Sequence, residues 1–218
     1  MNKLNLTAAL LIVCISGATA FATQTPVNIS AQANSTWCGL PSPGVLDCAT
    51  YPSGTQSYDG VTFDIPTVNN GWFAWVASDE GAGPASVTIP VNVAGVKTVY
   101  TLMNTMWGSS QSGLLSITFT GSSGTKWTYN LIGGADIRDS NNGSFTDSID
   151  CRIAAGAKKT GTVAAWSNGD GQRLDMQIFE LPASLKNQTL TSITIVDSGN
   201  TDVQRSFIAA LTVSTVAP

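Results

Sequence analysis

The sequence contains no histidine among its 218 residues, and this absence excludes several kinds of enzyme. Serine and cysteine hydrolases in their usual form need histidine as a general base, and most zinc, copper and iron enzymes need it as a ligand. Cysteine is also scarce, with four residues. The catalytic chemistry that remains is that of paired carboxylates, and no spacing in the chain singles out such a pair.

Charged residues make up only 11% of the chain, and the net charge is −4 without a basic run. Nucleic acids and anionic lipids are bound through clusters of lysine and arginine, so we expect neither as a partner. After the N-terminal segment, no apolar run is long enough to cross a bilayer as a helix, and we expect no membrane insertion.

The first 20 residues have the pattern of a secretory signal peptide. A positive start at Met1–Lys3 precedes an apolar run from Leu4 to Ile15, and small residues follow at Ala18-Thr19-Ala20. This order of a basic start, a short apolar run and a cleavage signal predicts removal of residues 1–20 and a secreted, extracellular protein.

Residues 21–57 are rich in Thr, Asn, Ser, Pro and Gly, and they predict an extended N-terminal segment. In an oxidising compartment we expect a disulfide between Cys38 and Cys48 to close a short loop in this segment. That pairing leaves Cys151 without a partner among the three cysteines that follow the signal peptide. Cys151 is either a buried free thiol, a disulfide partner of Cys38 or Cys48, or the site of an intermolecular disulfide.

The stretch from Val96 to Ile137 organises the rest of the chain. Val96–Leu102 is apolar on both faces, which is typical of a central strand covered on each side. Apolar residues then alternate with hydroxyl residues in Leu115–Phe119, a turn follows at Gly121–Gly124, and alternation resumes in Trp127–Leu131. This pattern predicts a hairpin with one buried face, on which Trp127 is expected in the core.

The other segments add short strands with alternating patterns, separated by turn residues. Pro90 indicates that its strand lies at a sheet edge or contains a bulge. With about ten strands spaced roughly 8–12 residues apart, the chain predicts an all-β fold, a single jelly-roll-type antiparallel β-sandwich over residues 58–218 without substantial helices. The remaining strands are expected at 58–65, 71–76, 86–93, 160–166, 174–181, 190–196 and 207–213.

Several of these segments resemble the galactose-binding-like jelly-roll β-sandwich domains of secreted bacterial proteins, which are often appended to glycoside hydrolases. The resemblance rests on the opening strand Asp59–Ile65, the strand Ser86–Val91, the strand Val99–Thr105 ending at Trp107-Gly108, the exit Gly133–Ile137 and the closing strand Phe207–Val213. It implies the same sandwich fold and a role in binding carbohydrate.

The loops at one end of the sandwich are the predicted ligand site, because loops of a jelly roll cluster at its two ends. Antiparallel geometry of the hairpin brings Trp107 and the segment Asp136–Asp139 to the same rim. A sugar stacked on Trp107 would meet Arg138 and Asp136 at its hydroxyls, and Asp139 belongs to the same predicted site. The alternative is that Trp107 is an apolar plug and Arg138 pairs with Asp136 or Asp139. We expect Trp166 and Arg173 to join this rim.

The Asp- and Asn-rich segment from Asp136 to Asp150 offers oxygen ligands, and a structural Ca²⁺ is the one metal that the sequence leaves open. Its spacing departs from that of an EF-hand, and a solvated loop is the simpler interpretation. No other cofactor is predicted.

The leading hypothesis is a secreted, non-catalytic carbohydrate-binding or cell-surface β-sandwich protein, whose partner is a carbohydrate or an extracellular polysaccharide. The first alternative is a structural or adhesive exported protein, a matrix or filament subunit that self-associates, which the low charge and the odd Cys151 would fit. The second is a carboxylate-dependent glycosidase or lyase, since candidate carboxylates occur at Asp64, Asp136, Asp139, Asp175, Glu180 and Asp197.

Overall fold

The computed structural model describes residues 23–36, 51–67, 72–75, 85–106, 112–140, 153–154, 158–159, 161–168, 172–198 and 205–216. The predicted signal peptide, all four cysteines and Trp107 lie outside these residues, so the predicted disulfide stays a prediction. Strands dominate the described part of the chain, and its one helix is the single turn α1 (Ala183–Lys186). None of the described helical residues forms a segment that is long and apolar enough to span a membrane.

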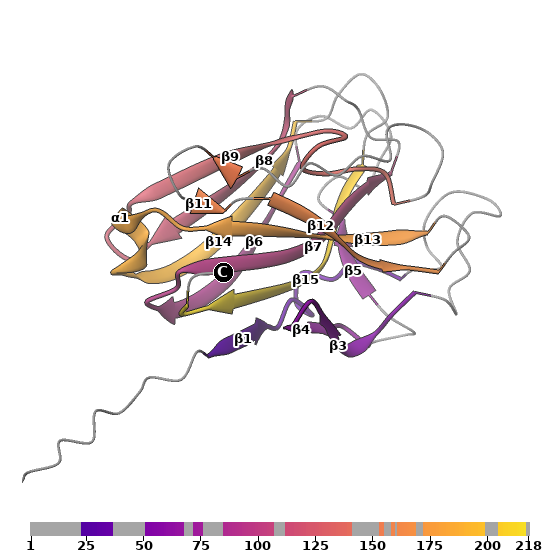
Figure 1. Cartoon of the computed structure of the whole chain (residues 1–218), viewed down its shortest axis with the longest axis horizontal. Coiled ribbons are helices and arrows are strands. Elements are labelled where there is room, and N and C mark those ends of the chain that lie inside the picture. The colour runs from indigo at the N-terminus through magenta and orange to yellow at the C-terminus, as the bar shows by residue number, and fades with distance from the viewer. Residues whose placement is uncertain are drawn as a thin grey trace, which may run out of the picture.

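Two antiparallel sheets form the body of the molecule (Figure 1). The larger sheet contains β1 (Gln24–Val27), β2 (Ser35–Thr36), β5 (Trp72–Trp75), β7 (Thr98–Met106), β12 (Gly161–Ser167), β13 (Arg173–Glu180) and β15 (Arg205–Ser214). Its order is β12-β13-β7-β15-β5-β2, and β1 also pairs with β15. The smaller sheet contains β6 (Ala85–Ala94), β8 (Ser112–Gly121), β9 (Lys126–Ile132) and β14 (Thr189–Asp197), in the order β6-β14-β8-β9.

The main core lies between the two sheets. Alternate residues of the smaller sheet point inward, among them Ile89, Ile117 and Ile193, and contact apolar residues of the larger sheet such as Val99 and Leu211. Because the side chains of a strand alternate between its two faces, the hydroxyl residues between these positions point outward. The hydrophobic alternation of the sequence therefore decides which face of the smaller sheet is buried.

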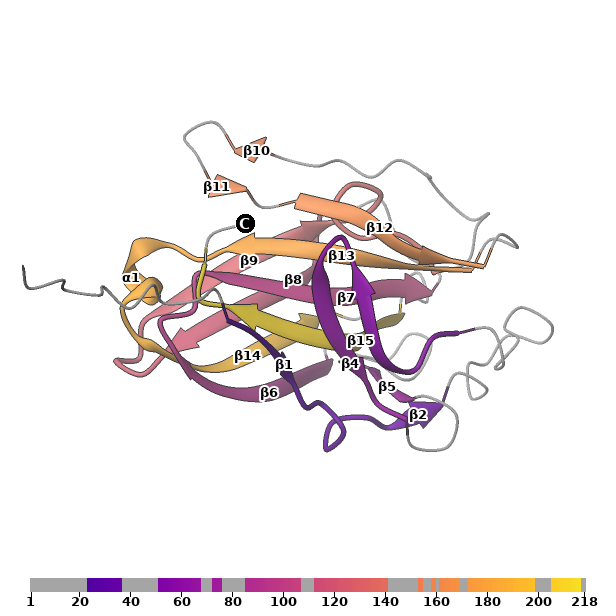
Figure 2. The ribbon, with the colours of Figure 1, turned by 60° about the horizontal axis from the view of Figure 1, so that its bottom comes forward.

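A third layer covers the outer face of the larger sheet. It is the hairpin of β3 (Gly54–Tyr58) and β4 (Val61–Ile65), which crosses β7 and β15 in Figure 2. Its residues Phe63 and Ile65 pack with Leu102 and Phe207 in a second core. Strand β7 is consequently buried along its whole length, as predicted for a strand that is apolar on both faces.

Most sequence predictions of strands agree with the structure, including the hairpin of β8 and β9. Pro90 lies on β6, the edge of the smaller sheet, opposite a register shift between Leu190 and Ser192. Both expectations for this proline, an edge and a bulge, are therefore confirmed. The predicted fold class, an all-β antiparallel sandwich, is confirmed too.

Two predictions of local structure differ from the structure. The strand expected over 58–65 is split, because Asp59 and Gly60 adopt positive φ angles of 48° and 77° and form a two-residue hairpin turn between β3 and β4. The segment 21–57, expected as an extended lead-in, contributes β1, β2 and β3. Pairing with β15 requires only backbone groups, so β1 needs no side-chain periodicity.

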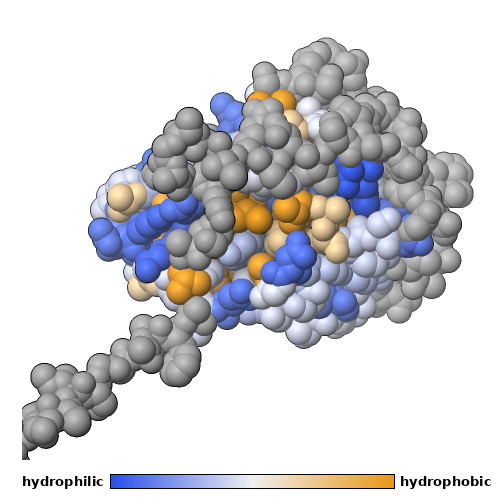
Figure 3. All heavy atoms as spheres, in the orientation of Figure 1, coloured by the Kyte–Doolittle hydropathy of each residue, from blue (hydrophilic) through white to orange (hydrophobic). Residues whose placement is uncertain are grey.

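Where it is coloured, the face of the molecule in Figure 3 is mostly hydrophilic or neutral, and apolar residues show in several small areas, some of them near the middle.

Candidate functional site

Residues 138–140 lie between two strands of the larger sheet, and we call them the rim segment. The pairing of β7 with β13 ends at Leu102 and Met176. Beyond this point Thr105 N of β7 donates to the Arg138 carbonyl (3.1 Å), Ser140 N donates to the Thr105 carbonyl (2.7 Å), and Arg173 N of β13 donates to the Ser140 carbonyl (2.9 Å). The rim segment thus satisfies the backbone groups of two strands that have separated.

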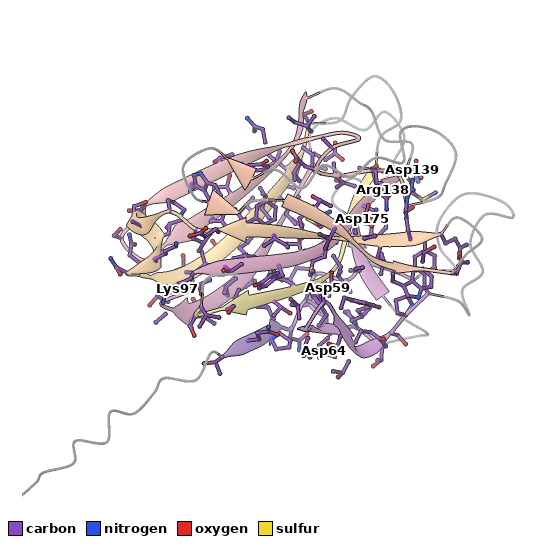
Figure 4. The ribbon with its side chains drawn as sticks, in the orientation of Figure 1. Asp59, Asp64, Lys97, Arg138, Asp139 and Asp175 are labelled. Carbon is purple, nitrogen blue, oxygen red and sulfur yellow. The ribbon has the colours of Figure 1, made fainter. Side chains whose placement is uncertain are left out.

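A buried ion pair holds the rim segment to β13. Arg138 Nε lies 2.8 Å from Asp175 Oδ2, and a terminal guanidinium nitrogen lies 2.9 Å from Asp175 Oδ1. Asn104 of β7 completes the arrangement, since its Nδ2 donates to Asp175 Oδ2 (2.9 Å) and its Oδ1 accepts from Asp175 N (2.9 Å). Figure 4 shows Arg138, Asp139 and Asp175 on the side of the molecule away from α1. Two-point geometry of this kind is the strongest form of a side-chain ion pair.

Asp136 closes the turn that follows β9. Its Oδ2 accepts from Ile132 N at 2.9 Å, and its carbonyl accepts from Thr162 Oγ1 of β12 at 2.6 Å and from Gln177 Nε2 of β13 at 3.4 Å. With 2% of its surface exposed, Asp136 acts as a structural link between the turn and the larger sheet.

Asp139 and Arg173 are also buried, and Arg173 Nε donates to the Asp139 carbonyl at 2.7 Å. Tyr51 lies against this pair, with its hydroxyl 3.5 Å from the Ser140 carbonyl. Burial raises the pKa of Tyr51 well above its ordinary value; the contact with Ser140 and the Arg173 charge act in the opposite direction, and the Asp139 charge adds to the rise. Tyr51 is therefore neutral at physiological pH and acts as a packing residue.

Trp166, at the end of β12, packs on Tyr51 with ring centroids 5.0 Å apart and planes inclined by 42°. Its ring is half-buried. Next to Trp166, two hydrogen bonds join Asn168 and Gln172. The side-chain Nδ2 of Asn168 donates to Gln172 Oε1 at 2.8 Å, and the backbone N of Gln172 donates to Asn168 Oδ1 at 3.1 Å. A partly exposed indole therefore lies two positions before Asn168, whose amide is held in place by Gln172.

The structure brings five of the predicted site residues into one neighbourhood. Arg138, Asp139 and Arg173 meet at the rim segment, Asp136 precedes it, and Trp166 is connected to it through Tyr51. The sixth, Trp107, lies outside the described residues. Arg138 pairs with Asp175, a partner that the sequence did not single out, because β13 presents Asp175 at the position where the strands separate. Of the five, Trp166 alone is not buried.

Sequence reasoning did not identify Asp175, Asn104 or Tyr51 as parts of this site. Asp175 alternates with Leu174 and Met176, a pattern that predicts a polar face rather than a buried position. Asp175 lies on the same face of β13 as Phe179, which packs in the main core, and no local pattern indicates that the rim segment brings Arg138 to it.

The other carboxylates named as catalytic candidates lie apart in the described structure. Asp64 is exposed on β4, as its label in Figure 4 shows. Asp197 Oδ2 accepts from the Ser206 hydroxyl at 2.7 Å, and Glu180 pairs with Lys186 at 2.6 Å. The described residues contain no group of three or more side chains suited to a metal ion, and positions 141–150 of the candidate calcium segment lie outside them.

The chain matches no family model and no curated protein. Among solved structures it is similar to CBM27-1, a carbohydrate-binding module of Caldicellulosiruptor saccharolyticus determined in complex with mannohexaose. The two chains are 10% identical, the superposition covers 90% of this chain and 99% of that chain, and the TM-score is 0.41.

Proposed function

We propose that the protein is a secreted, non-catalytic β-sandwich that binds carbohydrate at the end of the sandwich where the rim segment lies. The observation that carries this proposal is the half-buried ring of Trp166, which packs on Tyr51 and precedes the half-buried amide of Asn168 by two positions. Sugars present apolar C–H faces that stack on aromatic rings and hydroxyls that bond to amides.

The rigidity around Trp166 supports this function. Tyr51 fixes one face of the indole, and the buried network of Arg138, Asp175 and Asn104 fixes the strands that lie beneath. An aromatic ring that is already ordered loses little conformational entropy when a ligand binds to it. The site therefore has the preorganisation that a stacking contact requires.

The positions of the carboxylates support a non-catalytic role. Glycoside hydrolysis needs two carboxyl groups that face each other across the scissile bond. Asp136, Asp139, Asp175 and Asp197 are buried, and Asp136, Asp175 and Asp197 accept hydrogen bonds that hold the fold. The signal-peptide pattern of residues 1–20 supports an extracellular location.

The test compares two tryptophans that are both half-buried but lie in different parts of the sandwich. Trp127 packs on Phe119 in the main core with centroids 5.2 Å apart, whereas Trp166 lies at the rim. The wild type, Trp166→Ala and Trp127→Ala are titrated with soluble cello-, manno-, xylo- and chitohexaose by calorimetry, and their melting temperatures are measured.

We expect Trp166→Ala to abolish binding of the recognised hexaose, with a smaller loss of melting temperature than Trp127→Ala, which keeps binding while folded. Trp166→Tyr should retain measurable affinity, because its ring can still stack. Unchanged affinity in Trp166→Ala would contradict the proposal, as would a wild-type protein that binds no hexaose and elutes as a high-mass assembly in size-exclusion chromatography.

A further inference from the structure

The outer face of the smaller sheet is a regular array of hydroxyl groups. Twelve outward-pointing residues lie on four adjacent strands, three on each strand, and eight of them are serine or threonine. We call this array the hydroxyl face. Its members are Ser86, Thr88 and Pro90 of β6, Ser192, Thr194 and Val196 of β14, Ser116, Thr118 and Thr120 of β8, and Lys126, Thr128 and Asn130 of β9.

Register aligns these residues in rows across the sheet. Thr194 pairs with Thr88 on one side and with Thr118 on the other, and Thr118 pairs with Thr128, so that one row consists of four threonines. Neighbours in a row are about 4.8 Å apart, and successive rows are roughly 6.5–7 Å apart, from the spacing of strands and the rise per residue. The threonine row extends across the full width of the sheet.

Hydrogen bonds between side chains order this row. The hydroxyls of Thr88 and Thr194 are 3.0 Å apart, and those of Thr118 and Thr128 are 2.8 Å apart. Every hydroxyl has one donor hydrogen and two acceptor lone pairs. The bond within a pair uses one hydrogen and one lone pair, so each pair keeps a further donor and further acceptors for other partners. The four methyl groups of the row add small apolar areas between the hydroxyls.

The hydroxyl face carries one ionisable side chain, Lys126, among its twelve residues. Protein surfaces typically have about a quarter to a third of charged residues, so this face is depleted in charge. It offers neither the cation cluster that an anionic partner needs nor the carboxylates that a basic partner needs. A partner that complements it is neutral and rich in hydroxyl groups.

Energetics decide the physical form of that partner. A neutral hydrogen bond to a ligand replaces one to water, so each such contact contributes only about 0.5–1.5 kcal/mol in net terms. A small soluble sugar could make few of these contacts without a stacking ring. A solid surface with repeating hydroxyls can make many of them at once, and their sum exceeds the affinity of any one contact.

We propose that the hydroxyl face adsorbs to the solid surface of an insoluble neutral polysaccharide. This inference rests on the proposed function and adds a second contact, since the rim site at Trp166 would hold a single chain. The two contacts lie on different parts of the molecule, and variants can separate them.

The experiment measures partition of the full-length mature protein onto microcrystalline cellulose, chitin and insoluble mannan particles. The variants are Thr118→Lys and Thr194→Lys, which place a long charged side chain in the middle of the threonine row, and Thr118→Val, which removes a hydroxyl at nearly constant shape. The matched control is Thr55→Lys, because Thr55 is exposed on β3, in the layer on the opposite side of the larger sheet.

We expect both central lysine variants to weaken particle binding by about tenfold, which corresponds to about 1.4 kcal/mol. Thr118→Val should weaken it less, and Thr55→Lys should leave it unchanged. Soluble hexaose binding at Trp166 should be retained in all four, so that a defect in the rim site is distinguished from a defect in the face.

Particle binding that Trp166→Ala abolishes but the central lysine variants leave intact would overturn the inference while the proposed function stands. Failure of the wild-type protein to bind any of the three kinds of particle would overturn it too. A stable dimer in size-exclusion chromatography that the central lysine variants dissociate would assign the face to self-association and equally overturn it.

Discussion

Arg138 and Asp175 are 37 positions apart in the chain and share two parallel hydrogen bonds of 2.8 and 2.9 Å in the interior of the protein. The Asp175 side chain is fully buried and that of Arg138 is 10% exposed. Because the pair lies where β7 and β13 separate, it connects the rim segment to the larger sheet. It is the part of the candidate site whose energetic role can be measured most directly.

Removing one member of this pair should destabilise the protein strongly. Asp175→Leu leaves a buried guanidinium without its carboxylate and removes a partner of Asn104, so we expect the free energy of unfolding to fall by about 3–5 kcal/mol. Arg138→Met should have a similar effect. The double variant Arg138→Met/Asp175→Leu removes both charges and should be more stable than the sum of the single losses implies. Urea denaturation measures all three, and additive losses would contradict coupling between the two side chains.

The stability of the protein should fall at alkaline pH because of its buried tyrosines. Burial raises the pKa of Tyr58 from 10.0 to about 12, and it raises the pKa values of Tyr51 and Tyr100 as well. An unfolded tyrosine loses its proton near pH 10, whereas the folded protein retains it. The folded state therefore binds more protons above pH 10, and the free energy of unfolding decreases as pH rises.

Tyr58→Phe tests this effect without removing a hydrogen bond, because the Tyr58 hydroxyl is buried and has no hydrogen-bond partner among the described residues. We expect the variant to be at least as stable as the wild type at pH 7. Between pH 10 and 12 its stability should decline less steeply, which urea denaturation at a series of pH values would measure. Parallel declines in the two proteins would show that Tyr58 ionises equally in both states.

Gly121, at the end of β8, lies so close to the side chains of Gln188 and Leu185 that an added side chain must displace them. A Cβ at this position would lie 2.5 Å from Gln188 Oε1 and 2.9 Å from Leu185 Cδ2. Gln188 Oε1 accepts a hydrogen bond from Ser123 N at 2.9 Å, so displacement of the Gln188 side chain would release the β8–β9 turn.

Gly121→Ala should therefore lower the free energy of unfolding by about 1–3 kcal/mol, as overpacking usually does. Gly124→Ala is a useful comparison, because its Cβ would meet no atom within 4 Å and its cost would come from a positive φ of 82°. The double variant Gly121→Ala/Gln188→Ala should lose less than the two single variants together. Full additivity in thermal or urea unfolding would rule out the clash with Gln188.

The sequence by itself determined the class of the fold and most of its strands. Alternation in Leu115–Phe119 and Trp127–Leu131 predicted the β8–β9 hairpin, and a stretch apolar on both faces predicted the central strand β7. Pro90 predicted an edge because proline cannot donate to a ladder. These features are local: a side chain's face follows from its position in the strand, and a turn follows from its own residues.

Tertiary structure decided what covers the outer face of the larger sheet and which charges meet. The β3–β4 hairpin contacts β15 across about 150 positions of sequence, as the Thr212 hydroxyl bond to the Thr62 carbonyl illustrates, and no periodicity encodes such a contact. The end of the β7–β13 pairing admits the rim segment, whose Arg138 meets the buried Asp175 there. The sequence could place Arg138 near carboxylates, but the choice of Asp175 depends on where two distant strands separate. The hydroxyl face likewise became a row of threonines only through the register of β6, β14, β8 and β9, because alignment across a sheet is set by pairing between strands and not within one.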